Sequence, residues 1–132
     1  MTEKTVVQTV IWPTLRYDDA RAAIRFLVAM GFEEVVVYGE GEIVDHAQLR
    51  WPGGGGVMLG SAQREDSAIK DVVAGTGSIY VVIDNPDELH DRAVGLGANI
   101  TRGLTDEDYG SRGFTMKDPE GVYWSFGTYG GE

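Results

Sequence analysis

His46 is the side chain of this sequence best suited to acid–base chemistry. An imidazole titrates near neutral pH and often acts as a general base. The adjacent Asp45 is a poor partner, because neighbouring residues on a strand point to opposite faces. Glu42 would share a face with His46, but their backbones would stand about 13 Å apart at about 3.3 Å of rise per residue. A hydrogen-bonded histidine that lines a pocket is therefore the simpler interpretation.

Two further segments resemble ligand-binding motifs without completing them. The run from Gly53 to Gly56 lacks the Lys-Ser/Thr pair of a phosphate loop, so we expect a hairpin turn there. The acidic run from Thr105 to Tyr109 lacks the glycine and terminal glutamate of an EF-hand, so we expect a loop over residues 104–110. The chain has no cysteine, which excludes a thiol nucleophile, a thiolate metal site and disulfides.

Composition narrows the class of protein. With 132 residues, 42% of them hydrophobic and 24% charged, the chain is typical of one globular domain. The net charge of −10 argues against a nucleic-acid partner, since such proteins neutralise phosphates with Lys and Arg. It favours a cationic ligand or simply solubility. The sequence shows no membrane span and no signal peptide, so we expect a cytoplasmic protein without a membrane partner.

The elements that must position these side chains occur twice. Asp19 begins a helical run that reaches Gly31 after twelve residues, and Asn85 begins one that reaches Gly97 after the same twelve. Each half predicts a strand, a helix and three further strands. These are 5–17, 19–31, 33–38, 43–51 and 57–61 in the first half, and 78–84, 85–96, 98–102, 112–117 and 122–128 in the second. We therefore expect modules over 1–62 and 77–132, with a linker over 63–76, in one compact domain.

The order and spacing of several short segments resemble those of the vicinal oxygen chelate superfamily, which includes glyoxalase I, extradiol dioxygenases and bleomycin-resistance proteins. The segments are Leu15-Arg16-Tyr17-Asp18-Asp19, Phe26 and Met30-Gly31-Phe32-Glu33, then Tyr80-Val81-Val82-Ile83-Asp84, Leu96-Gly97-Ala98, Phe114 and Lys117-Asp118-Pro119-Glu120-Gly121. The resemblance implies an α+β fold of two βαβββ modules, whose curled mixed sheet surrounds a cup and carries its helices on the outer face. It also implies a homodimer that completes its cups between chains.

The resemblance locates four strand positions that supply metal ligands in metal-dependent members of the family. In this chain they are Trp12, Met58, Ser78 and Ser125. An indole, a thioether and two hydroxyls do not suit Zn²⁺, Ni²⁺ or Fe²⁺, which prefer imidazole and carboxylate. A shift by one residue supplies no better ligand. We therefore expect neither a metal nor another cofactor.

Strand alternation indicates which side chains face the cup. Apolar residues such as Leu15, Ala47 and Phe126 suit the helix-covered side, which turns their neighbours, among them Arg16, toward the cup. From these neighbours and the family positions we predict a ligand site lined by Trp12, Thr14, His46, Gln48, Met58, Ser78, Tyr80, Tyr123 and Ser125. Aromatic walls with a few hydrogen-bonding groups are typical of small-molecule pockets. We expect Tyr109, on the acidic loop, to close over the ligand.

The sequence thus predicts a metal-independent small-molecule-binding protein of the bleomycin-resistance type, which sequesters a cationic or aromatic compound such as an antibiotic. Three alternatives stay open. The first is a glyoxalase- or dioxygenase-like lyase or isomerase with a divergent site around His46. The second is a metalloenzyme with unexpected ligands, such as His46 with Glu42. The third is an interaction protein whose cup is empty.

Overall fold

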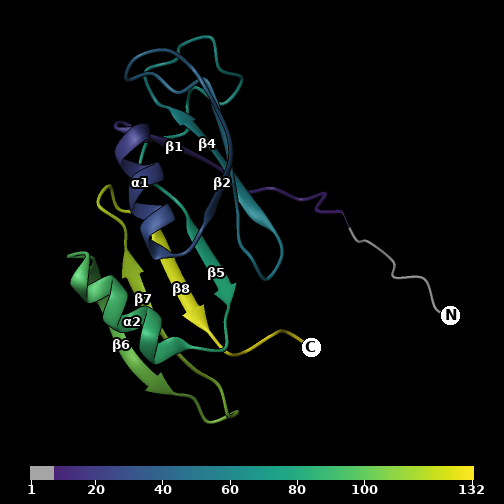
Figure 1. Ribbon diagram of the computed structural model, residues 1–132, viewed down its shortest axis with the longest axis vertical. Helices are drawn as coiled ribbons and strands as arrows, with labels where there is room; N and C mark the ends of the chain where they lie inside the picture. The colour runs from purple at the N-terminus through teal and green to yellow at the C-terminus, as the bar shows by residue number, and fades with distance from the viewer. Residues whose placement is uncertain (1–7) are drawn as a thin grey trace, which may run out of the picture.

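The computed structural model describes residues 8–132, which form two modules of the same topology (Figure 1). The first contains β1 (Thr14–Tyr17), α1 (Ala20–Met30), β2 (Glu33–Tyr38), β3 (His46–Arg50) and β4 (Gly56–Ser61). The second contains β5 (Ser78–Val82), α2 (Pro86–Gly95), β6 (Asn99–Asp106), β7 (Arg112–Lys117) and β8 (Tyr123–Gly127). The strand orders are β1-β4-β3-β2 and β5-β8-β7-β6, with β1/β4 and β5/β8 parallel. The predicted α+β class with two βαβββ modules is confirmed.

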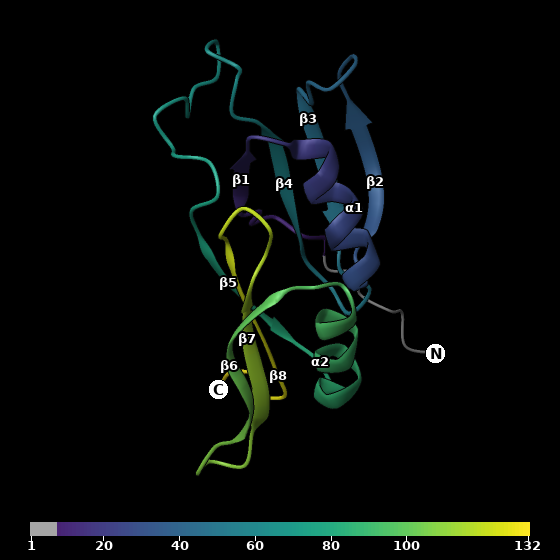
Figure 2. The same ribbon diagram turned by 90° about the vertical axis from the view of Figure 1, so that its left-hand side faces the viewer.

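The two modules follow one another along the long axis, and each helix covers one face of its own sheet (Figures 1 and 2). The helices also meet each other, since Arg92 of α2 donates a hydrogen bond to the carbonyl of Met30 at the end of α1, at 3.0 Å. In residues 8–132 the opposite face of each sheet carries no helix. Within residues 8–132, neither helix is long and apolar enough to cross a membrane.

Helix α1 forms where the sequence predicts it, because its ends and its apolar face agree. The carboxylate of Asp19 accepts a hydrogen bond from the N–H of Ala22 at 3.0 Å, which satisfies a free donor of the first turn. Ala23, Leu27 and Met30 are buried against the sheet. Gly31 ends the helix with a φ of 134°, a conformation that side-chain-bearing residues rarely adopt.

The strands alternate between the core and the open face of each sheet as the sequence predicts. Leu15, Ala47 and Leu59 are buried on the helix side of the first sheet, and Trp124 and Phe126 are buried in the second. These residues belong to one hydrophobic cluster that runs through both modules. Aromatic packing crosses the boundary, since the rings of Phe32 and Trp124 meet edge to face with centroids 5.5 Å apart. The two modules therefore share a core.

Two predicted strands are too long at their N-terminal ends. The strand expected over 5–17 begins at Thr14; residues 8–13 carry no strand and residues 1–7 lie outside the described part. Pro13 has no N–H and cannot extend the ladder. The strand expected over 43–51 begins at His46, because the N–H of Val44 binds the side-chain hydroxyl of Ser61 at 2.8 Å and not a backbone carbonyl of β4. Glu42 and His46 thus do not share a strand.

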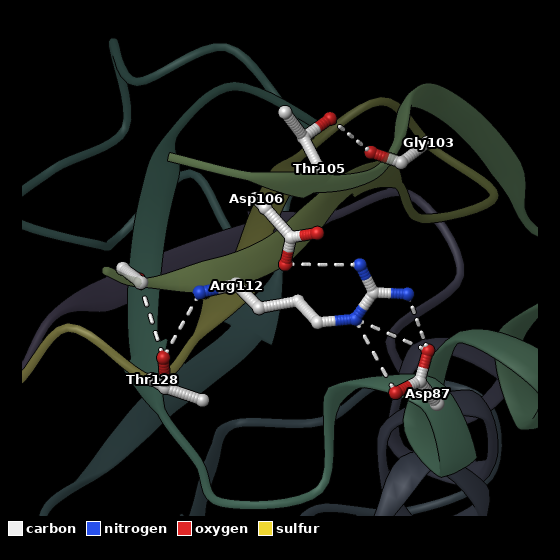
Figure 3. Close-up of polar contacts among 7 residues, drawn as sticks. Asp87, Gly103, Thr105, Asp106, Arg112 and Thr128 are labelled. Carbon is white, nitrogen blue, oxygen red and sulfur yellow. Dashed lines mark hydrogen bonds and ion pairs between the residues drawn. The ribbon is translucent and has the colours of Figure 1, made fainter. Parts of the chain in front are cut away.

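The acidic loop expected over 104–110 is also wrong in part, because β6 continues to Asp106. The guanidinium of Arg112 on β7 holds this end of the strand between two carboxylates (Figure 3). It binds Asp106 at 3.1 Å and Asp87, in the first turn of α2, at 2.7 Å. The hydrogen bond from Arg112 lowers the pKa of Asp87 below its ordinary value. Asp106 of the acidic segment therefore stabilises the pairing of β6 with β7, a role that composition alone does not reveal.

A buried carboxylate joins the two modules. Asp118 follows β7 and is 5% exposed, and its Oδ2 accepts hydrogen bonds from the Tyr17 hydroxyl of β1 at 2.6 Å and the Trp124 indole at 3.0 Å. Its Oδ1 accepts three backbone N–H groups of the following turn, at 3.0 to 3.1 Å. Burial, together with the charge of Asp118, raises the pKa of Tyr17 above its ordinary value.

The same turn caps the helix of the other module. The Glu120 carboxylate accepts hydrogen bonds from the N–H groups of Asp18 at 2.6 Å and Asp19 at 2.8 Å. These donors lie at the N-terminus of α1, where a negative charge is favourable because of the helix dipole. The β7–β8 turn of the second module therefore anchors both β1 and α1 of the first.

We expect Tyr17→Phe to destabilise the protein by about 1.5–3 kcal/mol at neutral pH, because it removes a hydrogen bond to a buried charged acceptor. The substitution should also change the response to alkali. A pKa raised by folding contributes stability below the unfolded value of about 10, and that stability falls by about 1.4 kcal/mol for each pH unit above it. Urea denaturation at pH 7 and at pH 11 measures both effects.

Tyr38→Phe is the matched control, since Tyr38 is 60% exposed. It should leave the free energy of unfolding and its alkaline loss close to those of the unmodified protein. An alkaline loss that is as large in Tyr17→Phe as in the unmodified protein would contradict the role assigned to the Tyr17–Asp118 hydrogen bond.

Candidate ligand-binding site

The open face of each sheet carries one hollow, and no residue lines both. The first hollow, of about 90 Å³, lies on the first module and is lined by Thr14, Arg16, His46, Met58, Arg64, Ser67 and Ile69, among others. The second hollow, of about 150 Å³, lies on the second module and is lined by Tyr80, Arg102, Glu107, Tyr109, Thr115, Ser125 and Gly127, among others. The repeated topology thus produces two related but chemically different sites.

The floor of the first hollow is formed by side chains that alternate outward from β1, β3 and β4. Thr14 and Met58 are direct partners in the parallel β1/β4 ladder. His46 on β3 is half-buried and stacks on Tyr38, with ring centroids 6.3 Å apart. In the described structure no side chain or backbone group is hydrogen-bonded to the imidazole of His46. A general base normally has such an orienting partner, so the geometry here is that of a contact residue.

Arg16 also lies on the open face, as predicted, but it is only 4% exposed. Its guanidinium donates hydrogen bonds to backbone carbonyls of the segment 62–72, which crosses this face of the sheet. The same segment contributes Arg64, Ser67 and Ile69 to the first hollow. The linker between the modules is therefore part of the site.

The second hollow combines hydroxyl groups with tyrosine rings. Thr115 and Ser125 are partners in the β7/β8 ladder, and their hydroxyls are hydrogen-bonded to each other at 2.9 Å. Tyr80 of β5 lies across Gly127, where an added Cβ would stand 2.6 Å from the Tyr80 hydroxyl. A side chain at position 127 would force the Tyr80 ring to shift from this position.

Two further tyrosines, Tyr129 and Tyr109, are connected to Tyr80. The Tyr80 hydroxyl donates a hydrogen bond to the carbonyl of Tyr129 at 2.8 Å. The ring of Tyr129 meets that of Tyr109 edge to face, with centroids 5.4 Å apart. Tyr109 is 67% exposed, so much of its ring is free to contact a ligand. We call Tyr80, Tyr109 and Tyr129 the tyrosine wall.

Each hollow has an arginine that is paired with a carboxylate. In the first, Arg64 lies 3.5 Å from a carboxylate oxygen of Asp45 and 3.0 Å from one of Asp66. In the second, Arg102 and Glu107 form an ion pair at 2.9 Å. The guanidinium of Arg16, the remaining arginine of the first hollow, is bonded to backbone carbonyls and is 4% exposed, so it offers a ligand little free surface.

The structure divides the residues predicted from the sequence into two groups. Thr14, His46 and Met58 line the first hollow, and Tyr80 and Ser125 line the second. The other four, Trp12, Gln48, Ser78 and Tyr123, line neither. Strand alternation assigns a residue to a face, but it does not say whether the residue lies at the hollow or beyond its end.

Two of these four residues have contacts elsewhere. Trp12 donates a hydrogen bond to the carbonyl of Thr9 at 3.3 Å and packs close to Gly56. Tyr123 lies beneath the ammonium of Lys117, which is 4.9 Å from the centre of its ring. Trp12, just before β1, and Tyr123, the first residue of β8, thus both contact other residues of the protein.

The four family metal positions do not form a metal centre. Met58 belongs to the first hollow and Ser125 to the second, whereas Trp12 and Ser78 line neither. Over residues 8–132 no group of three or more His, Asp or Glu side chains is placed to hold a metal ion. The indole, thioether and hydroxyl groups at the four family positions also do not suit Zn²⁺, Ni²⁺ or Fe²⁺ as ligands.

Several lining residues were not predicted. Arg64, Ser67 and Ile69 lie in a polar linker without periodicity, and Arg102 lies at a sheet position that its exposed neighbours do not distinguish. Arg16 was the one available signal: a charged residue between buried strand neighbours must find many hydrogen-bond acceptors.

Comparison with solved structures supports the fold. TioX from Micromonospora sp. ML1 is 26% identical, with a TM-score of 0.78 over 91% of this chain and 98% of TioX. The fosfomycin resistance protein FosX from Mesorhizobium loti is 12% identical, with a TM-score of 0.62 over 94% of both chains, and shows the fold alone.

Comparison with protein sequences also finds relatives over most of the chain. The uncharacterized proteins Rv0887c of Mycobacterium tuberculosis and Mb0911c of Mycobacterium bovis are each 32% identical over 130 residues, which cover 92% of this chain and 75% and 84% of the two relatives. The model of the Glyoxalase/Bleomycin resistance protein/Dioxygenase superfamily matches residues 8–126. With this match across nearly its whole length, the chain belongs to that superfamily, the vicinal oxygen chelate proteins.

Proposed function

We propose that this protein binds a small molecule without a metal, in the manner of the bleomycin-resistance members of its superfamily, and that the ligand carries a planar aromatic group. The observation that carries the proposal is the tyrosine wall beside the hydroxyls of Thr115 and Ser125 in the second hollow. Tyrosine rings supply stacking surface, and hydroxyls fix the orientation of a ligand.

A positive charge on the ligand would help it to approach rather than to bind. The ion pairs of both hollows balance their local charges. The chain as a whole carries a net charge of −10, and such a field raises the rate at which cations associate. Stacking of a cationic ring on tyrosine adds attraction of about 0.5–2 kcal/mol. A planar aromatic cation, the class to which parts of several antibiotics belong, is therefore the favoured ligand.

We further propose a homodimer in which the first hollow of one chain joins the second hollow of its partner. Strand β5 is an edge of its sheet, and its outward residues Tyr80 and Val82 are 49% and 50% exposed. Val10 and Ile11, just before β1, are 83% and 82% exposed. A groove of about 400 Å³ runs beside these residues. Open edges with apolar side chains are usually covered in native proteins, which supports a second copy as the occupant.

The position of His46 supports one alternative function. His46 lines the first hollow, so a lyase or isomerase that uses its imidazole without metal is the second candidate. His46→Ala distinguishes the two functions, because it would abolish turnover by such an enzyme but only alter affinity in a binding protein. The missing orienting partner of His46 favours binding.

We expect Tyr109→Ala to weaken binding of acridine orange, a planar aromatic cation, by about two- to tenfold, since one aromatic contact contributes about 0.5–1.5 kcal/mol. Tyr123→Ala is the matched control, because Tyr123 is also a partly exposed tyrosine of the second module but lines neither hollow. Fluorescence titration measures both affinities. Equal losses in the two variants, or no saturable binding by acridine orange or bleomycin, would contradict the proposal.

We expect no stoichiometric metal in the purified protein, because the four family positions hold Trp12, Met58, Ser78 and Ser125. The protein would be incubated with Ni²⁺, Co²⁺, Zn²⁺, Mn²⁺ or, without oxygen, Fe²⁺, then desalted and submitted to elemental analysis. A ratio near zero for each metal supports metal-independent binding. A ratio near one for any metal would show that other residues act as ligands and would require glyoxalase and dioxygenase assays.

A further inference from the structure

The guanidinium of Arg16 is surrounded by main-chain carbonyls. Its Nη2 donates to the carbonyls of Ala62 at 2.7 Å and Arg64 at 3.2 Å. Its Nη1 lies 2.5 to 3.2 Å from three more carbonyls, those of Ile69, Lys70 and Val72. One side chain thus gathers carbonyls from the whole stretch 62–72. Hydrogen bonds from a charged donor are stronger than those between neutral groups.

The backbone beside Arg16 holds both ends of the same segment. The N–H of Ala62 binds the carbonyl of Tyr17 at 2.9 Å, and the N–H of Gly75 binds the carbonyl of Arg16 at 3.0 Å. Between these points the segment has little apolar burial, since Ile69 and Val72 are 37% and 38% exposed and Val73 is 69% exposed. Its path over the sheet therefore depends on hydrogen bonds rather than on a hydrophobic core.

We propose that Arg16 is a positioning residue for the ligand site: it holds the segment 62–72 as a fixed wall of the first hollow. Through this wall Arg16 places Arg64, Ser67 and Ile69 beside the sheet residues of the hollow. The effect on affinity rests on the function proposed above, whereas the hold on the segment does not. Lysine would not replace Arg16, because an ammonium has three donors on one atom and cannot span carbonyls spread along ten residues.

Limited digestion with trypsin tests the hold on the segment without any ligand. Trypsin cleaves after Arg and Lys, and its oxyanion hole must bind the carbonyl of the residue before the cut. The carbonyls of Arg64 and Lys70 are bound to Arg16 in the native protein. We expect Arg16→Lys to raise the rate of cleavage after these two residues at least tenfold, as resolved by mass spectrometry.

Arg50→Ala is the matched control, because it removes an exposed strand arginine that pairs with Glu33 far from the segment. Its cleavage rates after Arg64 and Lys70 should equal those of the unmodified protein. Arg16→Ala provides a chemical rescue, since millimolar methylguanidinium chloride should restore protection where equal sodium chloride does not. If Arg16→Ala is cut throughout the chain from global unfolding, Arg16→Lys decides the outcome. Unchanged cleavage after Arg64 and Lys70 in Arg16→Lys would overturn the proposal.

Titration with acridine orange then tests the effect on the site. We expect Arg16→Lys to bind the dye at least threefold more weakly than Arg50→Ala does. If cleavage accelerates while affinity is unchanged, Arg16 holds the segment but does not position the ligand site, which overturns that half of the proposal. If the unmodified protein binds no dye, the proposed function fails, and digestion still decides whether Arg16 holds the segment.

Discussion

The buried carboxylate of Asp118 is the constraint on which the rest of the structure depends. A carboxylate is stable in a protein interior only when its oxygens are fully hydrogen-bonded. Here the partners come from both modules: Tyr17 from the first strand, and Trp124 with three backbone N–H groups from the end of the chain. A displaced first module would remove the hydrogen bond from Tyr17 and leave this buried charge with one partner fewer. The hydrogen bond therefore adds a directional constraint on the relative position of the two sheets to their apolar packing.

The same constraint determines which residues reach the hollows. Because Tyr17 points inward to Asp118, the preceding Arg16 points to the open face, where it meets the carbonyls of the segment 62–72. Because Trp124 points inward, Ser125 points outward beside Thr115. Because successive strand residues point to opposite faces, the inward side chains of Tyr17 and Trp124 determine that their neighbours face the two hollows. The buried face of each sheet thus holds the packed core, and the polar side chains of the hollows lie on the open face of the same strands.

Local patterns of the sequence predicted the fold well because both modules have local signals: a helix with an apolar face, a glycine after it and alternating strands. They failed where a distant partner decides the outcome. Tyr17 and Asp118 lie far apart in the chain. Arg112 of β7 holds the end of β6 by binding Asp106 of β6 and Asp87 of α2. Strand alternation assigns the predicted site residues to a face, but it does not say which of them lie at a hollow; Trp12 and Ser78 line neither hollow. The linker gave no signal, because its structure comes from Arg16.

We propose that the tyrosine wall and the hydroxyls of Thr115 and Ser125 receive a planar aromatic ligand. Backbone amide chemical shifts of the ¹⁵N-labelled protein, followed during titration with acridine orange, test it most directly. We expect the largest shifts at Tyr80, Thr115, Ser125 and Gly127, which line the second hollow. Shifts confined to α1 and α2, or scattered over acidic surface residues, would show non-specific association and would contradict the account.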